Sequence, residues 1–127
     1  MPLDREGRNP LHYAAANGQL DELLRLIEGG EDASLPDRSG FTPLHFAAIE
    51  GQPEAIALLL GAAAEVDPQD KWGDTPLWRA VFNTKRRAEC VALLLDAGAN
   101  PDLDNASGVS PRALAARMGA FDLIPSR

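Results

Sequence analysis

The chain has 127 residues, of which 45% are hydrophobic but only 6% aromatic, and its formal net charge is −7. This length fits one domain or a short array of small units, and a core filled by alanine and leucine favours packed helices over a β-sandwich. The acidic balance disfavours nucleic-acid binding, because proteins of that class neutralise phosphates with basic residues. The longest apolar run, 55–64, is about half of what a bilayer span requires, so a membrane protein is also disfavoured.

Two further features bear on the location of the protein. The N-terminal stretch MPLDREGRNP is charged and lacks the apolar segment of a secretory signal. The single cysteine, Cys90, has no second cysteine with which to form an internal disulfide. We therefore expect a cytoplasmic protein that is monomeric when free.

One sequence motif, which contains a proline followed by a short helical pattern, recurs along the chain at a nearly fixed spacing. Pro10, Pro43 and Pro76 are 33 residues apart, and Pro111 opens a degraded fourth copy 35 residues later. A repeat of this kind cannot bury its own apolar face and needs stacked neighbours. We expect a single domain over 1–127. Its four units should cover approximately 4–36, 37–69, 70–104 and 105–127.

Each unit is predicted to begin with a short helix. Its N-cap precedes the proline, which fits the first helical position because its missing N–H has no partner there. The expected N-caps are Asn9, Thr42, Thr75 and Ser110. Left-handed glycine caps should end this helix in three copies, at Gly18, Gly51 and Gly119. The third copy has two extra residues and no such glycine, and Asn83 is the predicted substitute because asparagine tolerates left-handed geometry.

A second, leucine-lined helix is predicted in each unit, at roughly 20–28, 53–61 and 88–96. In the fourth unit only the segment AFDLI, 120–124, is available for it before Pro125. Turn-rich segments follow these helices. Ala63 stands where other units have Gly30 and Gly98, so we expect it to hold a strained left-handed backbone.

The period, the TPLHFA phrase at 42–47 and the DAGANPDLD segment at 96–104 resemble the ankyrin repeat family. This resemblance implies an all-α ankyrin repeat solenoid of about three and a half helix-turn-helix units with projecting hairpin-like fingers. It also implies that binding takes place on the concave face, which the fingers and the first helices form.

The histidines and the cysteine do not indicate a catalytic or metal site. His12 and His45 recur at the repeat period, so we interpret them as structural residues that bond to an N-cap or to a turn backbone group. Zinc needs about four ligands, and these residues offer no ligand spacing. Cys90 belongs to a second helix and the histidines to first helices, which argues against a Cys–His nucleophile pair. No phosphate-binding glycine motif is present.

The carboxylates are also interpreted as structural. Three aspartates recur at the starts of the units, where they are assigned to turn hydrogen bonds, namely Asp4, Asp37 and Asp70. We therefore expect no enzyme, no cofactor and no metal.

The concave face is the remaining candidate for function. Large aromatic residues at Phe41, Trp72 and Phe82 are hard to explain by packing within the stack, although packing on neighbouring fingers is the alternative. Trp, Tyr and Arg dominate interface energetics. The predicted protein-binding residues are Arg5, Arg8, Arg38, Phe41, Ile49, Lys71, Trp72, Asp74, Arg79 and Phe82. The segment Lys85–Arg87 is interpreted as a solvated loop, with a docking site for an acidic partner as the alternative.

The sequence thus predicts a non-catalytic module that binds a protein partner, whose identity stays open, through a rigid concave face. One alternative is a bacterial immunity-type protein that neutralises a cognate toxin, since an acidic inhibitor suits a basic nuclease. Its acidic residues, however, are expected on the second helices rather than on the concave face. The other alternative is a structural spacer without a dedicated partner.

Overall fold

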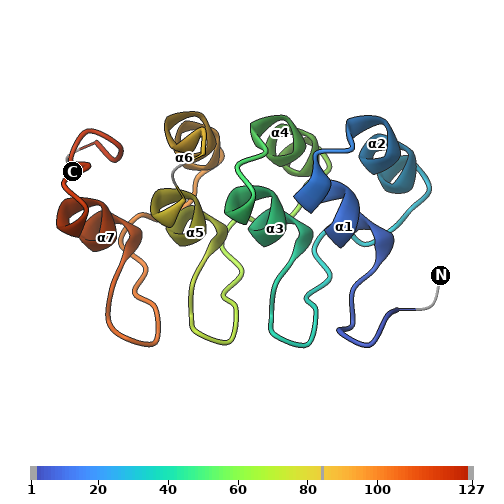
Figure 1. The fold of residues 1–127 in the computed structure, drawn as a ribbon, viewed down its shortest axis with the longest axis horizontal. Coiled ribbons are helices and arrows are strands. Elements are labelled where there is room, and N and C mark those ends of the chain that lie inside the picture. The colour runs from blue at the N-terminus through green and yellow to red at the C-terminus, as the bar shows by residue number, and fades with distance from the viewer. Residues whose placement is uncertain (1–2, 84, 126–127) are drawn as a thin grey trace.

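The computed structural model describes residues 3–83 and 85–125, and within them all regular secondary structure is helical. The helices are α1 (Pro10–Asn17), α2 (Leu20–Glu28), α3 (Pro43–Ile49), α4 (Pro53–Gly61), α5 (Pro76–Phe82), α6 (Arg87–Asp96) and α7 (Pro111–Arg117). They stack as antiparallel pairs in two layers, with α1, α3, α5 and α7 in one layer and α2, α4 and α6 in the other (Figure 1). The all-α repeat solenoid predicted from the sequence is confirmed.

The first helix of each unit starts as its capping residue predicts. Thr42 has extended backbone geometry, and its hydroxyl accepts the N–H of His45 at 3.3 Å. Asn9, Thr75 and Ser110 cap their helices in the same way. The left-handed glycines are also confirmed, with φ of 65° at Gly18, 65° at Gly51 and 72° at Gly119.

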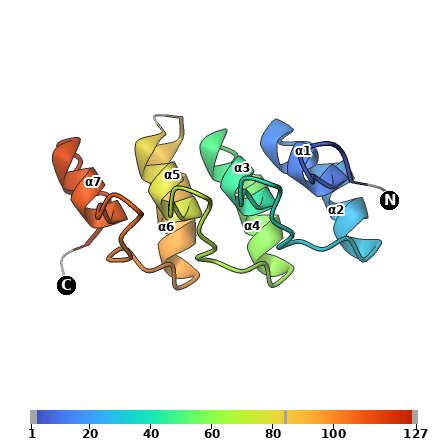
Figure 2. The ribbon, with the colours of Figure 1, turned by 90° about the horizontal axis from the view of Figure 1, so that it is seen from below.

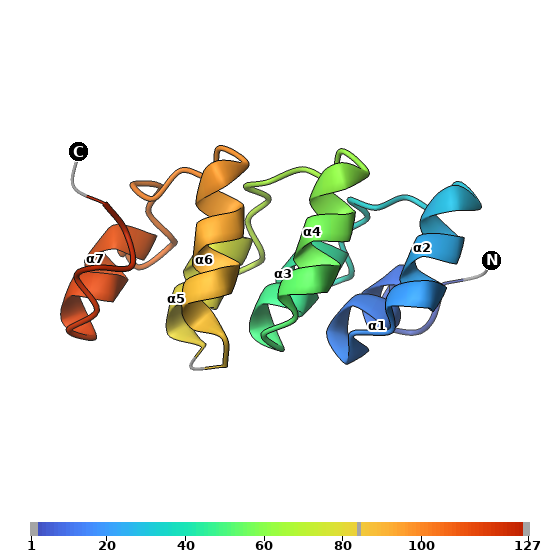
Figure 3. The ribbon, with the colours of Figure 1, turned by 90° about the horizontal axis from the view of Figure 1, so that it is seen from above.

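The core lies between the two layers and repeats from unit to unit. Leu11, Leu44 and Leu77 occupy the same place on the first helices and are fully buried. The second helices, which face the viewer in Figure 3, contribute a matching buried row. Its members are Leu23, Leu26, Ile56, Leu59, Val91 and Leu94. Each unit therefore completes the apolar layer of its neighbour.

Four loops, which we call fingers, project from one side of the helical layers (Figures 1 and 2). They comprise residues 4–9, 37–42, 70–75 and 105–110. In the third finger, one carboxylate oxygen of Asp70 accepts the N–H groups of Trp72 and Asp74, both at 3.0 Å. Asp4 and Asp37 make the equivalent bonds, which confirms their predicted role in the turns. Asn105 makes them in the fourth finger, so a neutral amide can hold this turn.

Backbone hydrogen bonds join each finger to the next. The N–H of Arg38 donates to Glu6 at 2.7 Å, and that of Lys71 donates to Ser39 at 2.9 Å. The N–H of Ala106 donates to Trp72 at 3.0 Å. Because all three bonds use the same position of the repeat, the fingers are held at a constant spacing.

Two local predictions were wrong. Asn83 has extended geometry, φ −73° and ψ 145°, and its side-chain amide donates to the carbonyls of Ala48 and Ile49 at 3.0 and 2.7 Å. The left-handed residue is Arg86, with φ 47°, directly before α6. The segment 121–124 forms turns rather than a helix. About one turn of helix is not stable without partners, because the first turn fixes three residues for a single hydrogen bond.

The substitution Ala63→Gly is expected to raise the free energy of unfolding by about 1 kcal/mol. Ala63 has φ 63°, a conformation that Gly30 and Gly98 adopt in other units at 88° and 95°. The gain is expected because an L-residue is strained there and glycine is not. Urea unfolding followed by tryptophan fluorescence measures the change. Ala62→Gly is the matched control: Ala62 has φ −90°, so its replacement should lower stability. Equal effects of the two substitutions would contradict the interpretation.

Candidate functional site

An arginine surrounded by aromatic rings occupies the centre of the concave face, the surface formed by the fingers and by α1, α3, α5 and α7. The guanidinium carbon of Arg79 lies 5.2 Å from the ring centre of Phe41, 5.5 Å from that of Trp72 and 5.7 Å from that of Trp78. The rings of Phe41 and Trp72 are in contact, at 5.7 Å between centres. These distances are within cation–π range, so the three rings and the cation form one packed group.

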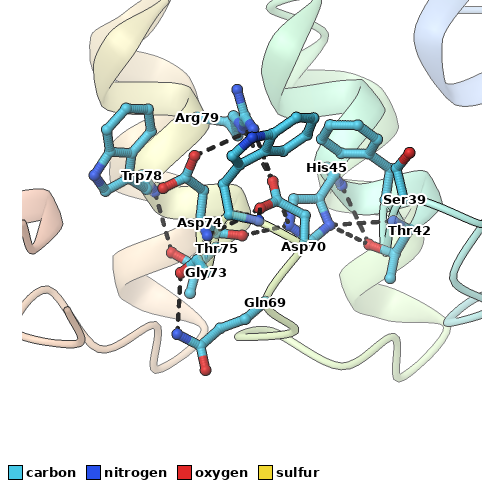
Figure 4. A network of polar contacts seen from close by, with 12 residues as sticks. Ser39, Thr42, His45, Gln69, Asp70, Gly73, Asp74, Thr75, Trp78 and Arg79 are labelled. Atoms are coloured by element: carbon cyan, nitrogen blue, oxygen red, sulfur yellow. Dashed lines mark hydrogen bonds and ion pairs between the residues drawn. The ribbon is translucent and has the colours of Figure 1, made fainter. Parts of the chain in front are cut away.

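Two carboxylates, those of Asp70 and Asp74, form ion pairs with Arg79. Nε and Nη2 donate to one oxygen of Asp70 at 3.1 and 2.9 Å, and Nη2 also reaches Asp74 at 3.1 Å. The Asp70 side chain is fully buried, and Figure 4 shows how it lies between Arg79 and His45. Its two oxygens have separate tasks, since one closes the finger turn and the other binds the guanidinium. These charge-assisted hydrogen bonds to buried carboxylates therefore fix the position of the Arg79 guanidinium.

A related arrangement joins the first two units. Arg8 donates from Nε to Asp37 at 3.0 Å, and its guanidinium lies over Phe46 at 4.9 Å and over Tyr13 at 5.8 Å. Phe46 in turn contacts Phe41 at 5.6 Å. Cations and rings thus alternate across the first three units of the concave face.

His45 connects the second and third units beneath this group. Its Nδ1 accepts the N–H of Thr42 at 3.1 Å, so its Nε2 carries the proton and donates to the carbonyl of Asp74 at 2.8 Å. The Asp70 carboxylate is farther from Nε2, at 3.8 Å. Burial lowers the pKa of His45 to about 4 and also lowers the pKa of His12, which bonds to the carbonyl of Phe41 at 3.0 Å. The structural role predicted for both histidines is confirmed.

We expect neither histidine to titrate at its ordinary pKa of about 6.5. Below that pH the unfolded chain binds protons that the folded chain does not, so the free energy of unfolding should fall as the pH drops from about 6.5 towards about 4. NMR of the imidazole ring signals measures this directly. For His45, ring shifts constant between pH 8 and pH 6, with the neutral tautomer protonated on Nε2, are the expected result; for His12 we expect a midpoint below its ordinary pKa. A midpoint near 6.5 for His45 would show that the ring is not locked in this network.

Two shallow grooves flank Arg79. The larger has a volume of about 500 Å³ and lies between the third and fourth units. Trp72, Trp78 and Arg79 line one side of it, and Ser107, Val109 and other fourth-unit residues line the other. The second groove, of about 380 Å³, is lined by Ile49, Arg79, Phe82 and Asn83. Both are open to solvent and have mixed polar and apolar walls.

Most of the predicted binding residues lie on this face, but they differ in exposure. Trp72 is 48% exposed and Phe82 is 60% exposed, the latter stacked on Trp78 at 5.6 Å. Phe41, Ile49, Arg8 and Arg79 are partly buried, and Arg5, Arg38 and Lys71 are exposed at the fingers. Asp74 is only 4% exposed; its carboxylate accepts from Arg79 and from Asn105, so it positions other residues.

Three aromatic residues of this face were not selected from the sequence. Tyr13 and Phe46 occupy the same repeat position as Arg79, and Trp78 occupies the position of the two histidines. Comparing equivalent positions across the units would have found them. The indole N–H of Trp78 is buried and has no hydrogen-bond acceptor among the described residues, unlike the imidazoles that it replaces.

The loop before α6 is dominated by ion pairs. Arg86 makes paired hydrogen bonds to Glu54, at 3.0 and 2.9 Å, and to Glu89, at 3.1 and 2.8 Å. Lys85 is exposed. One of the three basic residues of the alternative docking site is therefore already engaged by carboxylates.

Within residues 3–83 and 85–125, no three His, Cys, Asp or Glu side chains come together as a metal site would require. Over the same residues, none of the helices has the length and apolar character needed to cross a bilayer.

Comparison with protein families agrees with the geometry. A family profile described as ankyrin repeats in three copies matches residues 2–70, and one described as a single ankyrin repeat matches residues 72–106. A search of curated proteins gave no match. The stacked helix pairs, the projecting fingers and these matches lead to one conclusion: the chain belongs to the ankyrin repeat family.

Proposed function

We propose that this protein is a non-catalytic binding module that recognises a folded protein partner through its concave face, with Trp72, Phe41 and Arg79 at the centre. The observation that carries the proposal is a half-exposed tryptophan fixed against a buried ion-pair network. Ankyrin repeats are generally protein-interaction modules, which gives this surface a matching role.

The rigidity of the surface supports tight recognition. The finger backbone is bonded on both sides of Trp72, by the turn bond to Asp70 and by the bond from Ala106 to the Trp72 carbonyl. Lys71 lies over the indole, with its ammonium 4.5 Å from the ring centre. Side chains that are already ordered lose little entropy on binding, so more of the contact energy contributes to affinity.

The two grooves beside Arg79 have room for individual partner side chains. An arginine between two grooves, beside a tryptophan that lines the larger one, matches the composition of energetically dominant interface residues. The toxin-neutralising alternative, the spacer alternative and the cytoplasmic location stay predictions from the sequence.

Trp72→Ala is expected to weaken partner binding by about 2 kcal/mol or more, roughly 30-fold in Kd. Affinity capture with the wild-type chain, followed by mass spectrometry, identifies bound proteins, and the purified partner is then titrated against each variant. Leu24→Ala is the matched control, because Leu24 is an exposed apolar residue on α2, away from the concave face. A partner that binds wild type and Trp72→Ala equally well would remove Trp72 from the site.

A further inference from the structure

We propose that α7 and residues 118–125 form a hinged flap, which opens away from the third unit and widens the larger groove beside Trp78. The flap is a property of the chain itself, and it goes beyond the proposed function without depending on it. It follows from two hydrogen bonds that recur between the earlier first helices and that no described residue makes between α5 and α7.

The first of these bonds lies at the N-terminal ends of the first helices. The imidazole of His12 on α1 bonds to the carbonyl of Phe41, just before α3, at 3.0 Å. The imidazole of His45 on α3 bonds to the carbonyl of Asp74, just before α5, at 2.8 Å. Trp78 has the same position on α5, but its indole N–H is buried without an acceptor in the described part of the chain. The start of α7 is therefore not joined to α5 in this way.

The second bond lies at the opposite ends of the same helices. The side-chain amide of Gln52 donates to the carbonyl of Ala16 at 3.2 Å and joins the end of α1 to the second unit. The amide of Asn83 joins the end of α3 to the third unit, with bonds of 3.0 and 2.7 Å. In the fourth unit, Ala120 has the place of Gln52 and Met118 that of Asn83. Neither side chain carries an amide, so the end of α5 receives no such bond from the fourth unit.

The fourth unit also covers its first helix differently. The helices α2, α4 and α6 lie over their partners, whereas a loop lies over α7 (Figure 1). In this loop Ile124 is buried, but Phe121 is 71% exposed. The carbonyl of Pro125 accepts from Arg112 of α7 at 2.6 Å, so the loop is attached to α7. A segment with few buried apolar contacts opens locally at a lower free energy than the whole chain unfolds.

The hinge lies at the first turn of α7. There the N–H of Arg112 donates to the carbonyl of Pro101 at 2.9 Å, and its Nε donates to Asp102 at 2.8 Å. The fourth finger is joined to the third by the bond from Ala106 to the carbonyl of Trp72. These contacts hold the fourth finger and the start of α7 in place, and the far end of α7 is the part that moves.

Movement of the flap changes the larger groove. Leu114 and Arg117, both on α7, contribute to one side of it, and Trp72, Trp78 and Arg79 line the other. The third-unit side is fixed, because the guanidinium of Arg79 is paired with two carboxylates. Opening of the flap therefore widens the groove from one side and brings the indole N–H of Trp78 into contact with solvent.

Native-state hydrogen exchange of the full chain, followed by NMR at low urea concentrations, tests the flap. We expect the amides of α7 to have protection about 100-fold lower than those of α3 and a weaker dependence on urea, because a local opening exposes little surface. The indole N–H of Trp78 should exchange together with the α7 amides, and the amide of Ala106 should exchange more slowly. Equal protection and urea dependence in α7 and α3 would overturn the flap. Exchange of Ala106 together with α7 would overturn the hinge.

Ala120→Gln supplies the missing amide. The backbone at Ala120 matches that at Gln52, since both N–H groups donate to the carbonyl five residues earlier at 2.8 Å. We expect this variant to slow the exchange of the α7 amides and of the Trp78 indole N–H about tenfold, as one added hydrogen bond would. Ala120→Glu is the matched control, because glutamate has the same size but no N–H to donate. Equal exchange in the two variants would overturn the role assigned to the missing amide.

Discussion

Asp70→Ala is expected to lower the free energy of unfolding by about 3–5 kcal/mol, a large share of the roughly 5–15 kcal/mol typical of a folded domain. The Asp70 side chain is fully buried and accepts from two backbone N–H groups and from Arg79. Its removal leaves the N–H groups of Trp72 and Asp74 and the Nε of Arg79 without this acceptor, and Asp74 remains as the carboxylate partner of the guanidinium. A loss of this size is expected because each buried donor without a partner costs about 1–3 kcal/mol.

Asp70→Asn separates the two tasks of this carboxylate. Asn105 holds the equivalent turn in the fourth finger with an amide oxygen, so the asparagine variant should keep the turn and lose only the pairing with Arg79. We expect it to be destabilised less than Asp70→Ala. Urea unfolding followed by circular dichroism measures both variants. Equal loss in the two would mean that the turn bonds contribute nothing beyond the ion pair.

Gly73→Ala is expected to destabilise the chain by about 3 kcal/mol or more, the second large effect. Gly73 has φ +80°, and a Cβ placed there would lie 2.6 Å from the backbone nitrogen of Ala106. That nitrogen donates to the carbonyl of Trp72, so the fourth finger must move and the bond must break. The backbone cannot rotate away as a flexible side chain would.

Gly108→Ala is the matched control for this substitution. Gly108 has φ +77°, and its added Cβ would meet nothing within 4 Å. It should therefore show only the left-handed strain of about 1–2 kcal/mol. The difference between the two variants in thermal or urea unfolding isolates the contact between fingers. Identical losses would show that the third and fourth fingers are not tightly joined.

The regular parts of the fold could be predicted because each residue's role recurs. Thr42, Gly51 and His45 each have counterparts one period away, so local chemistry and register point to the same structure. Ala63 was identified as left-handed for the same reason, from the glycines at equivalent positions. Repetition made up for the weakness of any single local signal.

The parts that were not predicted depend on contacts between units. Asn83 was predicted to end α5 as a left-handed cap. Instead its side-chain amide donates to two carbonyls at the end of α3, and its backbone is extended. Arg79 and Asp74 were selected as surface residues, whereas they form a partly buried pair that also contacts Phe41 of the second unit and Asn105 of the fourth. Partners in other units cannot be inferred from a pattern within one unit.

The hydrogen bonds of the two histidines have a direction along the chain, and this matters during synthesis. His12 and His45 each bond to a carbonyl 29 residues further on. A unit emerging from the ribosome therefore holds an imidazole whose acceptor has not yet been translated. The hydrogen bonds of that unit are completed only when the following unit has been synthesised. Folding of the chain should therefore lag behind translation by about one unit.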